Sequence, residues 1–531
     1  MGKMWLLLML LAPLAGAAAA LYLGDGRLRL VRLASLVATL AALLFAALIV
    51  TNYQTPTART AGEPFGSDPD FAIRMPWLIY SQSEQTAPTT VYLELGVDGL
   101  SVWLIGLTAL LMVPAVLISW ETITDRPAAY YALLLSLETA MLGVFCAMDA
   151  VLFYVFFEFT LLPLFFLIGL WGGPRKRYAA KKFFIYTLAG SIISLVGLVG
   201  VILTLRDAGQ PLTFSLTELA FRAGKTPIDA ALQNWLFLAL FIGLAVKVPL
   251  FPFHTWLPLA HVEAPTAGSV LLAGVLLKLG TYGFLRLALP LLPAACLQIG
   301  QPLVALLAVI GILYGSLCAL AQDDIKKLVA YSSVAHLGFC MLGLFALNAE
   351  GMSGALLQMV NHGLSTGLLF LLVGMIYDRY HTRSMKELGG LAQRLPLLSF
   401  FMVVTCLASV GLPGLNGFVG EVLCLFGMYA VHPAYAVWGA VGIVLGAWYL
   451  MTLLQRVFFG PLREPAHGDE VVTDMNRREL AAVVPLVVFC VWIGVYPKPF
   501  LGAMKPEITA LAERLAETAR QLQAPSTSAG E

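Results

Sequence analysis

The chain has 531 residues, of which 59% are hydrophobic and 12% are charged, and its mean hydropathy is +0.84. A soluble domain carries roughly 25% charged residues, so this chain has too little polar surface to be covered by water. Its net charge is +1 and it contains no long basic run, which excludes an electrostatic case for nucleic acid binding. The composition predicts an all-α integral membrane protein, with residues 1–531 forming a single polytopic membrane domain.

Apolar runs long enough to cross a bilayer recur along the whole chain. A span needs about 20 mostly apolar residues, and this rule predicts about 14 transmembrane helices. The first run resembles a signal peptide, because small residues follow from Ala15 to Ala20, but only Lys3 precedes it and a second span follows at once, so we favour a retained helix. The expected spans lie near residues 4–23, 28–51, 97–119, 129–147, 150–171, 181–205, 233–261, 266–289, 297–320, 326–347, 352–377, 396–431, 436–458 and 479–500.

Lysine and arginine collect in alternate loops, and this bias predicts the orientation of the chain. We expect the basic loops on the cytoplasmic side, and an even number of spans then places both termini on the outer, periplasmic side. The polar C-terminal tail, residues 501–531, is expected to be frayed or helical at the surface. The basic loops lie near residues 27–32, 126, 175–182, 326–327, 379–394 and 456–478.

Two of the predicted spans, the seventh and the twelfth, are too long and contain helix breakers. Pro249 lies in the seventh span, and Pro413 and Gly414 lie in the twelfth. A proline removes an amide donor and clashes with the preceding turn, so both helices should be discontinuous. Broken helices at matching positions of two halves are typical of transporters, so we expect two inverted five-helix repeats, each a half-channel, over residues 129–289 and 297–458. Such breaks also occur in purely structural helices, and that alternative stays open here.

Four charged side chains fall inside apolar spans, where each costs about 2.5–3.5 kcal/mol on insertion scales. The structural alternative is a buried ion pair or a side chain that reaches the membrane surface. Glu158 has long apolar runs on both sides, Lys247 immediately precedes the break, and Lys278 is central in its span. We therefore favour a functional role for these three and group with them Glu421 of the twelfth span.

Histidines add further polar groups to the same spans. A lone buried histidine is often a satisfied interior residue, so His336 and His362 are weaker signals by themselves. Around the seventh break, His254, His261 and Glu263 form another group, but their spacing matches no standard zinc motif, and we expect no metal site. The polar neighbours of His336 and His362, which could hold water, are Ser332, Ser333, Asn361, Ser365 and Thr366.

Buried acidic and basic side chains of this kind are suited to carrying protons. Burial and nearby charges shift their pKa values by up to ~3–5 units, which allows proton exchange near neutral pH. Moving one charge through 100 mV costs ~2.3 kcal/mol, which a single pair barely matches. We therefore predict a proton-translocating chain of Glu158, Lys247, Lys278, His336, His362 and Glu421.

Redox chemistry, in contrast, has no visible site in this sequence. The seven cysteines stand singly in apolar runs and form no CxxC pair, which argues against zinc or an iron–sulfur cluster. No GxGxxG follows a strand, so a dinucleotide site is not expected either. The cysteines are interpreted as small buried hydrophobic residues.

Several motifs resemble those of one known family. The segments are KVPLFPFHTWLPLAHVEAPTAGSVLLAGVLLKLGTYG, DDIKKLVAYSSVAHLGF, NHGLSTGLLFLLVG and GLPGLNGFVGE. They are similar to the antiporter-like membrane subunits of respiratory complex I, a family that also includes subunits of multisubunit sodium/proton antiporters and membrane-bound hydrogenases. The resemblance covers most of the chain from about residue 95 to residue 458.

Within this family the sequence looks most like the M-type branch, which includes mitochondrial chain 4. Glu421 stands where relatives typically have lysine, and the chain ends soon after the last span. One departure is Leu259, where many relatives have aspartate, although His261 and Glu263 remain nearby. The roles that the resemblance implies are a coupled pair of Glu158 and Lys247, a central relay of Lys278 and His336, its extension His362, and Glu421 facing the outward exit.

The resemblance also implies where the chain works and with what. It would be a proton-translocating subunit of NADH-quinone oxidoreductase, an enzyme whose flavin (FMN), iron–sulfur clusters and quinone site lie in partner subunits, with no cofactor or metal in this chain. L-type and N-type subunits would flank it in the bacterial inner (plasma) membrane or the inner mitochondrial membrane. Two other interpretations stay open: a subunit of a sodium/proton antiporter or membrane-bound hydrogenase, and a membrane scaffold whose buried charges only pair.

Overall fold

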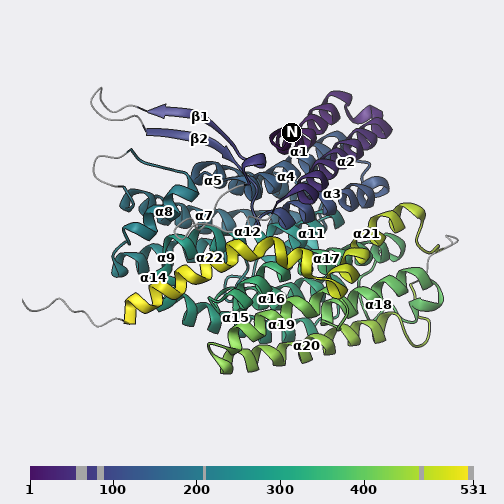
Figure 1. Ribbon diagram of the computed structural model, residues 1–531. Coiled ribbons are helices and arrows are strands. Elements are labelled where there is room, and N and C mark those ends of the chain that lie inside the picture. The colour runs from purple at the N-terminus through teal and green to yellow at the C-terminus, as the bar shows by residue number, and fades with distance from the viewer. Residues whose placement is uncertain (55–67, 81–88, 207–210, 466–471, 524–531) are drawn as a thin grey trace, which may run out of the picture.

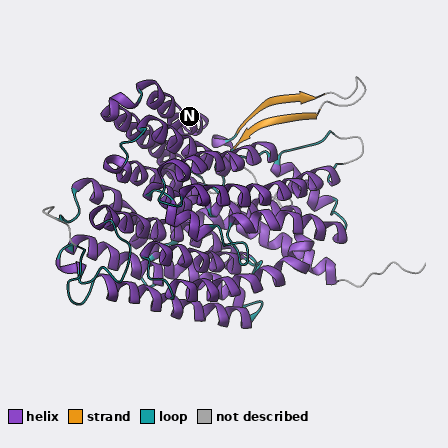
Figure 2. Ribbon diagram, turned by 180° about the vertical axis from the view of Figure 1, so that it is seen from behind, coloured by secondary structure: helices purple, strands orange, loops and turns teal. Residues whose placement is uncertain are grey.

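The computed structural model describes the chain except for residues 55–67, 81–88, 207–210, 466–471 and 524–531. Helices make up most of the described chain and pack side by side (Figures 1 and 2). Within the described residues, 13 helical stretches are long and apolar enough to cross a membrane. The predicted class, an all-α polytopic membrane protein, is confirmed.

The first seven spans follow the predicted apolar runs. The short helix α8 (Leu216–Lys225) lies in the loop before the seventh span, and the 3-10 turn η1 (Asp25–Arg27) joins the first two spans. The spans are α1 (Gly2–Leu23), α2 (Leu28–Asn52), α3 (Val102–Thr122), α4 (Pro127–Cys146), the consecutive pair α5 (Ala150–Phe159) and α6 (Leu161–Trp171), α7 (Lys176–Thr204) and α9 (Ala230–Lys247).

The later spans include one short apolar helix that is half of a broken span. The 3-10 turn η6 (Leu391–Gln393) precedes this broken span. The ninth span starts with α14 (Pro293–Ala295) and the π-helical η5 (Cys296–Gly300). The remaining helices are α15 (Gln301–Leu320), α16 (Ile325–Leu344), α17 (Ala349–Tyr380), α18 (Pro396–Val410), α19 (Asn416–Tyr429), α20 (Pro433–Val457) and α21 (Arg477–Val495).

Both predicted helix breaks are present. In the seventh span, α9 ends at Lys247, and residues 248–256 are non-helical before α10 (Leu257–Glu263). In the twelfth span, Gly411 and Gly414 separate α18 from α19 with φ angles of 80° and 91°. These angles lie in the left-handed region, which glycine adopts without the Cβ clash of other residues. The inverted relation of the two five-helix repeats stays a prediction.

The eighth span is irregular in a way that the sequence did not indicate. α11 (Thr266–Leu271) passes into a π-helical segment, η3 (Leu272–Leu276), and Lys278 begins α12 (Lys278–Gly283) just after it. A second π-helical segment, η4 (Phe284–Ala288), leads into α13 (Leu289–Leu291). Short π-helical segments often mark functional positions, and this one places Lys278 in a fully buried helix.

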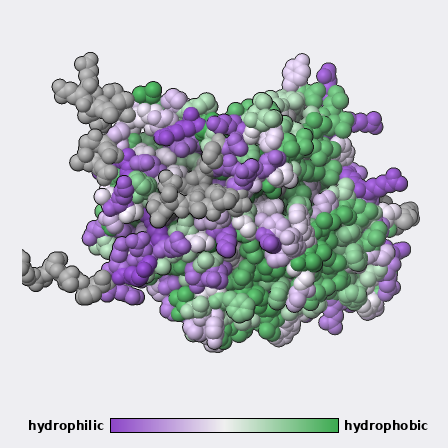
Figure 3. Space-filling model, viewed as in Figure 1, coloured by the Kyte–Doolittle hydropathy of each residue, from purple (hydrophilic) through white to green (hydrophobic). Residues whose placement is uncertain are grey.

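One face of the bundle carries a hairpin and a long surface helix. Strands β1 (Ile73–Tyr80) and β2 (Thr89–Leu95) pair antiparallel beyond the 3-10 turn η2 (Pro69–Phe71) and project from the helices in Figure 2. α22 (Lys498–Gln523) runs across the bundle in Figure 1, between α14 and α17. In Figure 3 the surface over α1 and α2, and over α18, is mostly hydrophobic, as expected for helices that face lipid.

The C-terminal tail is therefore a packed helix over most of its length. α22 is amphipathic, and its apolar side chains, among them Phe500, Met504 and Leu511, are buried against the bundle. Of the two expected forms of the tail, the structure has the helical one as far as Gln523, and residues 524–531 lie outside the described part.

Charged side chains other than the four singled out in the sequence are also buried within the predicted spans. Arg286 and Asp98 are fully buried, and both guanidinium nitrogens donate to the Asp98 carboxylate, at 2.6 and 2.8 Å. Arg286 also donates to the Tyr282 hydroxyl at 2.7 Å. A bidentate pair of this kind is specific in its geometry, and removing one partner of such a buried pair typically costs about 3–5 kcal/mol. The Asp98–Arg286 pair thus connects the segment just before α3 to the second π-helical segment of the eighth span.

Asp149, the N-cap of α5, provides a test of how the span that carries Glu158 is anchored. Its carboxylate accepts from the backbone N–H groups of Val151 and Leu152, at 2.8 and 3.1 Å. Burial raises its pKa from 3.8 to about 6. The folded state therefore binds the proton more tightly than the unfolded state, and stability should fall as the pH rises from about 4 to about 6.

We predict that Asp149→Asn keeps the cap and removes this pH dependence, so that its advantage over the parent chain grows between pH 4.5 and 7. Asp149→Ala should be about 1 kcal/mol less stable than Asp149→Asn at every pH, because it also lacks the titratable group but loses the cap. Thermal unfolding of the purified chain in detergent measures both effects. Parallel pH profiles for the parent and Asp149→Asn would contradict the prediction.

Candidate functional site

The centre of the candidate site is the ammonium group of Lys278. Its side chain is fully buried, donates to the carbonyl oxygen of Ala273 in η3, and lies 2.7 Å from His362 Nδ1. In η3 the amide of Leu277 bonds to the carbonyl of Leu272, five residues earlier, so the backbone pattern around Ala273 differs from that of an α-helix. The π-helical segment thus supplies a carbonyl ligand for the buried charge.

A second histidine continues the polar line toward the twelfth span. The rings of His362 and His336 have centroids 5.7 Å apart. His336 Nδ1 lies 3.1 Å from Glu421 Oε1, and Gln358 Nε2 donates to the same oxygen at 3.2 Å. All of these side chains are buried, so the four predicted residues from Lys278 to Glu421 form one connected group inside the protein.

The break between α18 and α19 is held by a reciprocal pair of amides. Asn361 Nδ2 donates to the Asn416 carbonyl at 2.7 Å, and Asn416 Nδ2 donates to the Asn361 carbonyl at 3.2 Å. Backbone groups freed by a helix break must find partners inside a membrane protein, and this pair meets part of that need. Because Asn416 begins α19, the amide pair also positions Glu421 one turn and a half further along the helix.

The other two predicted residues lie in the first half of the chain and are less tightly connected. Lys247 Nζ donates to Thr160 Oγ1 at 3.4 Å and lies 4.3 Å from the centre of the Phe157 ring. Both partners flank Glu158 in the sequence, which brings Glu158 into the neighbourhood of the Lys247 ammonium group. Among the described residues Glu158 Oε1 is buried without a hydrogen-bond partner, and no hydrogen bond links Glu158 to Lys247.

A small cavity lies beside Lys247, on the side of the eighth span. It measures about 10 Å³ and is lined by Lys247, Trp256, Leu272 and Leu276 among others. About 10–15 Å³ of such volume is the least that holds one water molecule. Its lining includes both Lys247 and two residues of η3, the segment that precedes Lys278.

The supporting residues around the seventh break have separate surroundings. The His254 ring packs against Phe251 and Tyr314, whereas Glu263 accepts from the backbone amide of Arg175 at 2.8 Å. His261 is fully buried and stacks on Phe370, with 4.5 Å between ring centroids. Across the described residues no group of three or more His, Cys, Asp or Glu side chains is arranged to hold a metal ion.

The remaining supporting residues are two serines, a threonine and the helix breakers, and among the described residues only the serines of this set make hydrogen bonds through their side chains. The hydroxyls of Ser332 and Ser333 both donate to the Val329 carbonyl, at 2.8 and 3.2 Å. Thr366 is fully buried, and its hydroxyl has no partner in the described part of the chain. The breakers Pro249, Pro413 and Gly414 lie in the two interruptions, as the sequence indicates.

Sequence reasoning missed several residues of the site. Gln358 binds Glu421, Thr160 binds Lys247, and the Tyr449 hydroxyl lies 3.5 Å from His336 Nε2. A usable signal existed for Gln358, which precedes His362 by one helical turn in an apolar span. Glu138 of α4 was also missed; it is fully buried, and neither carboxyl oxygen has a partner among the described residues.

The comparisons with known proteins agree with this geometry. The sequence profile described as NADH:quinone oxidoreductase/Mrp antiporter, transmembrane, matches residues 147–446. The chain is 44% identical over 429 residues to NADH-quinone oxidoreductase subunit M of Rhodobacter capsulatus, covering 80% of this chain and 82% of the relative.

The chain belongs to this family, in its subunit M or chain 4 branch.

Other relatives cover nearly the whole chain. The chain is 38% identical to NADH-ubiquinone oxidoreductase chain 4 of Arabidopsis thaliana over 506 residues, an alignment that covers 95% of this chain and 96% of the relative. A chain of respiratory complex I from Thermus thermophilus with bound NADH superposes with a TM-score of 0.82 at 31% identity, over 96% of this chain and 99% of that one. A chain of an archaeal membrane-bound sulfane sulfur reductase shares the fold, with a TM-score of 0.78 at 22% identity over 96% and 99%. The membership and the membrane fold expected from the sequence are confirmed.

Two glycines of the twelfth break provide a matched test of how Glu421 is held. A Cβ on Gly411 would lie 2.9 Å from Glu421 Oε2, whereas a Cβ on Gly414 would meet nothing within 4 Å. Both glycines have left-handed φ angles, so alanine at either position should cost about 1–2 kcal/mol of stability.

We predict that only Gly411→Ala also displaces the Glu421 carboxyl from His336. Infrared carboxyl bands, assigned with Glu421→Gln, should shift in Gly411→Ala and stay unchanged in Gly414→Ala. Equal shifts in both variants would show that backbone strain, and not the contact, controls the carboxyl group.

Proposed function

We propose that this chain is a proton-translocating, non-redox subunit of the membrane arm of NADH-quinone oxidoreductase. The observation that supports this most strongly is the buried line from Lys278 through His362 and His336 to Glu421. Each member can bind or release a proton, and each lies near the next. A buried charge needs a compensating partner. A change of protonation at one member therefore changes the electrostatic energy of its neighbours.

The line contains the features of a proton relay. Lys278 and His362 share a hydrogen bond, and so do His336 and Glu421. A histidine has two distinct ring nitrogens, so it can accept a proton on one side and donate it on the other. The 5.7 Å between the two ring centroids is the step that needs a ring rotation or one bridging water.

Glu158 and Lys247 provide the second element, a pair whose electrostatic coupling can drive the transfer. When Glu158 is ionised it stabilises the Lys247 ammonium, and when this influence weakens the lysine releases its proton. Lys247 is the last residue of α9, directly before the break, so a small movement of the non-helical segment changes its surroundings. The cavity beside Lys247 supports a water-mediated connection to the Lys278 group.

The same proposal covers the assembly around the chain. The NADH, FMN, iron–sulfur and quinone sites would lie in partner subunits, and L-type and N-type subunits would flank this one in the bacterial inner or inner mitochondrial membrane. Both termini would lie on the outer side. Support comes from the relatives, which are named as subunits of NADH-quinone or NADH-ubiquinone oxidoreductase.

The alternative is a subunit of a sodium/proton antiporter or a membrane-bound hydrogenase, because the matching family profile also names the Mrp antiporter. Purification of the native complex separates the two. We expect flavin-containing and iron–sulfur subunits to copurify with this chain and to retain NADH-quinone reductase activity. A stable complex without them would contradict the proposal.

Single variants test the proton-carrying role. We predict that Lys247→Ala, Glu158→Ala and His336→Gln each reduce proton translocation more than tenfold while the complex still assembles. His336→Gln is the sharpest of the three, because glutamine can still hydrogen bond to Glu421 but cannot carry a proton. The measurement is proton uptake by vesicles together with NADH oxidation.

The control is Lys225→Ala, which removes an exposed lysine of α8 outside the candidate spans. Normal translocation by all three variants would favour a scaffold whose buried charges only pair.

A further inference from the structure

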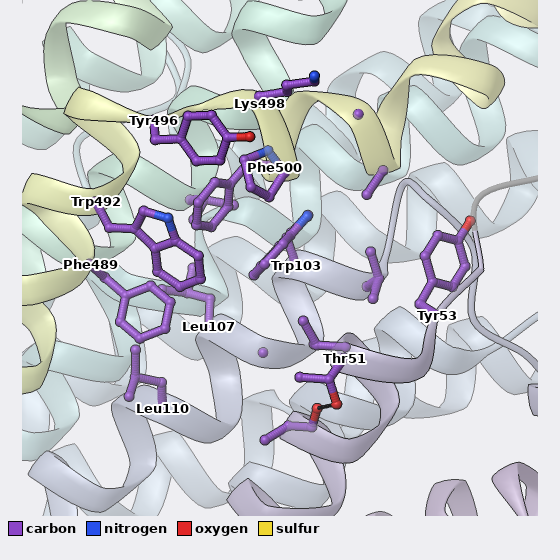
Figure 4. A pocket seen from close by; sticks show the side chains of 18 of the residues that line it. Thr51, Tyr53, Trp103, Leu107, Leu110, Phe489, Trp492, Tyr496, Lys498 and Phe500 are labelled. Carbon is purple, nitrogen blue, oxygen red and sulfur yellow. Dashed lines mark hydrogen bonds between the residues drawn. The ribbon is translucent and has the colours of Figure 1, made fainter.

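A large cavity lies away from the buried line of polar residues, between α2, α3, α17, α21 and the start of α22. It measures about 980 Å³, which is at the upper end of the range of about 300–1,000 Å³ for ligand pockets. Figure 4 shows its wall, with Phe489 and Trp492 on one side, Tyr53 on the other and Trp103 between them. The wall below these rings consists of aliphatic side chains, Leu107 and Leu110 among them.

The aromatic side chains form a continuous surface at the boundary of the membrane span. The ring centroids of Trp103 and Phe500 are 4.1 Å apart, and those of Trp492 and Phe500 are 5.2 Å apart. Trp492 and Tyr496 remain 40% and 52% exposed. Tryptophan and tyrosine are enriched where a bilayer meets water, and these residues lie at the end of α21 opposite to Arg477.

The charged side chains at the mouth of the cavity are all positive. Lys498 and Lys505 are the charged residues among the described lining of the cavity, and both are exposed. They are seven residues apart on α22, so they lie on the same side of the helix about 10 Å apart along its axis. Neither has an acidic partner within the described chain. The nearby carboxylate of Glu507 is fully buried and accepts from the Tyr53 hydroxyl.

One buried donor inside the cavity also lacks a partner. Trp103 Nε1 is buried and has no hydrogen-bond acceptor among the described residues. Buried donors are normally satisfied, so an unpaired indole N–H on the wall of a cavity points to an acceptor on a bound molecule. An ester carbonyl at the top of an acyl chain is such an acceptor.

We propose that this cavity, with Lys498 and Lys505 at its mouth, binds one anionic diacyl phospholipid of the surrounding membrane. The acyl chains occupy the aliphatic and aromatic wall, the two ammonium groups bind the phosphate, and Trp103 donates to an ester carbonyl. An apolar cavity open at the membrane boundary selects a lipid, and the two lysines select a negative headgroup.

The test uses the purified, delipidated complex and three phospholipids with identical photoactivatable chains: phosphatidylglycerol, cardiolipin and phosphatidylcholine. We expect phosphatidylglycerol to label peptides within residues 102–110 and 489–506. Each lysine near an anionic headgroup contributes about fivefold in binding. The double variant Lys498→Gln/Lys505→Gln should therefore need roughly 30-fold more phosphatidylglycerol for equal labelling. Cardiolipin labelling at the same peptides would show that the site also accepts the larger anionic lipid.

Two further variants keep the result interpretable. Lys225→Gln removes an exposed lysine outside the cavity and should leave labelling unchanged. Gly106→Phe should abolish labelling by filling the cavity, because a Cβ at Gly106 meets only the Val50 side chain within 4 Å. Equal labelling by phosphatidylcholine, no loss in the double lysine variant, or a quinone or neighbouring helix found in the cavity would overturn the proposal. None of these readouts depends on proton translocation, so the proposed function and this site can fail separately.

Discussion

The burial of the Lys278 ammonium group is the constraint on which the rest of the structure depends. An unpaired charge at the centre of a bilayer costs several kcal/mol, so its surroundings must supply partners. The partners are the His362 ring and the Ala273 carbonyl of the π-helical segment. The irregular eighth span thus supplies one partner of this group, and α17 supplies the other. The Asp98–Arg286 pair fixes the same span at its end, so the lysine is held from two sides.

The two halves of the buried line differ in how firmly they are connected. From Lys278 to Glu421, direct hydrogen bonds and close ring contacts link the groups, and the paired amides of Asn361 and Asn416 hold the break beside them. In the first half, Lys247 contacts the Thr160 hydroxyl and the Phe157 ring, and among the described residues no hydrogen bond links it to Glu158. In the proposed function, the hydrogen-bonded residues from Lys278 to Glu421 would form a fixed relay. The less tightly held pair of Glu158 and Lys247 would be the part that changes its protonation and contacts.

The sequence was sufficient for the membrane class, both helix breaks and the location of six titratable residues within the spans, because each depends on a local and costly feature. An apolar run, a proline within it or a lone charge needs no knowledge of neighbouring helices. The π-helical segment, Gln358 and the Asp98–Arg286 pair were not predictable in this way, since their roles arise from contacts between segments far apart in the chain. Asp98 and Arg286 are 188 residues apart, and only packing brings them together. For the C-terminal tail the sequence left a frayed and a helical form open. The apolar face of α22 is buried only by contact with the rest of the bundle, which the sequence alone does not show.

The small cavity beside Lys247 has a consequence for what can leak across the membrane. With about 10 Å³ it reaches at most the volume of a single water molecule. A sodium ion that entered would have to shed nearly all of its hydration shell, and the cavity lining offers aliphatic and aromatic side chains with one ammonium group in place of oxygen ligands. A proton needs no such space, because it moves by exchange along hydrogen bonds. If protons pass this point as proposed, ion size and ligand chemistry alone would make it selective against alkali cations.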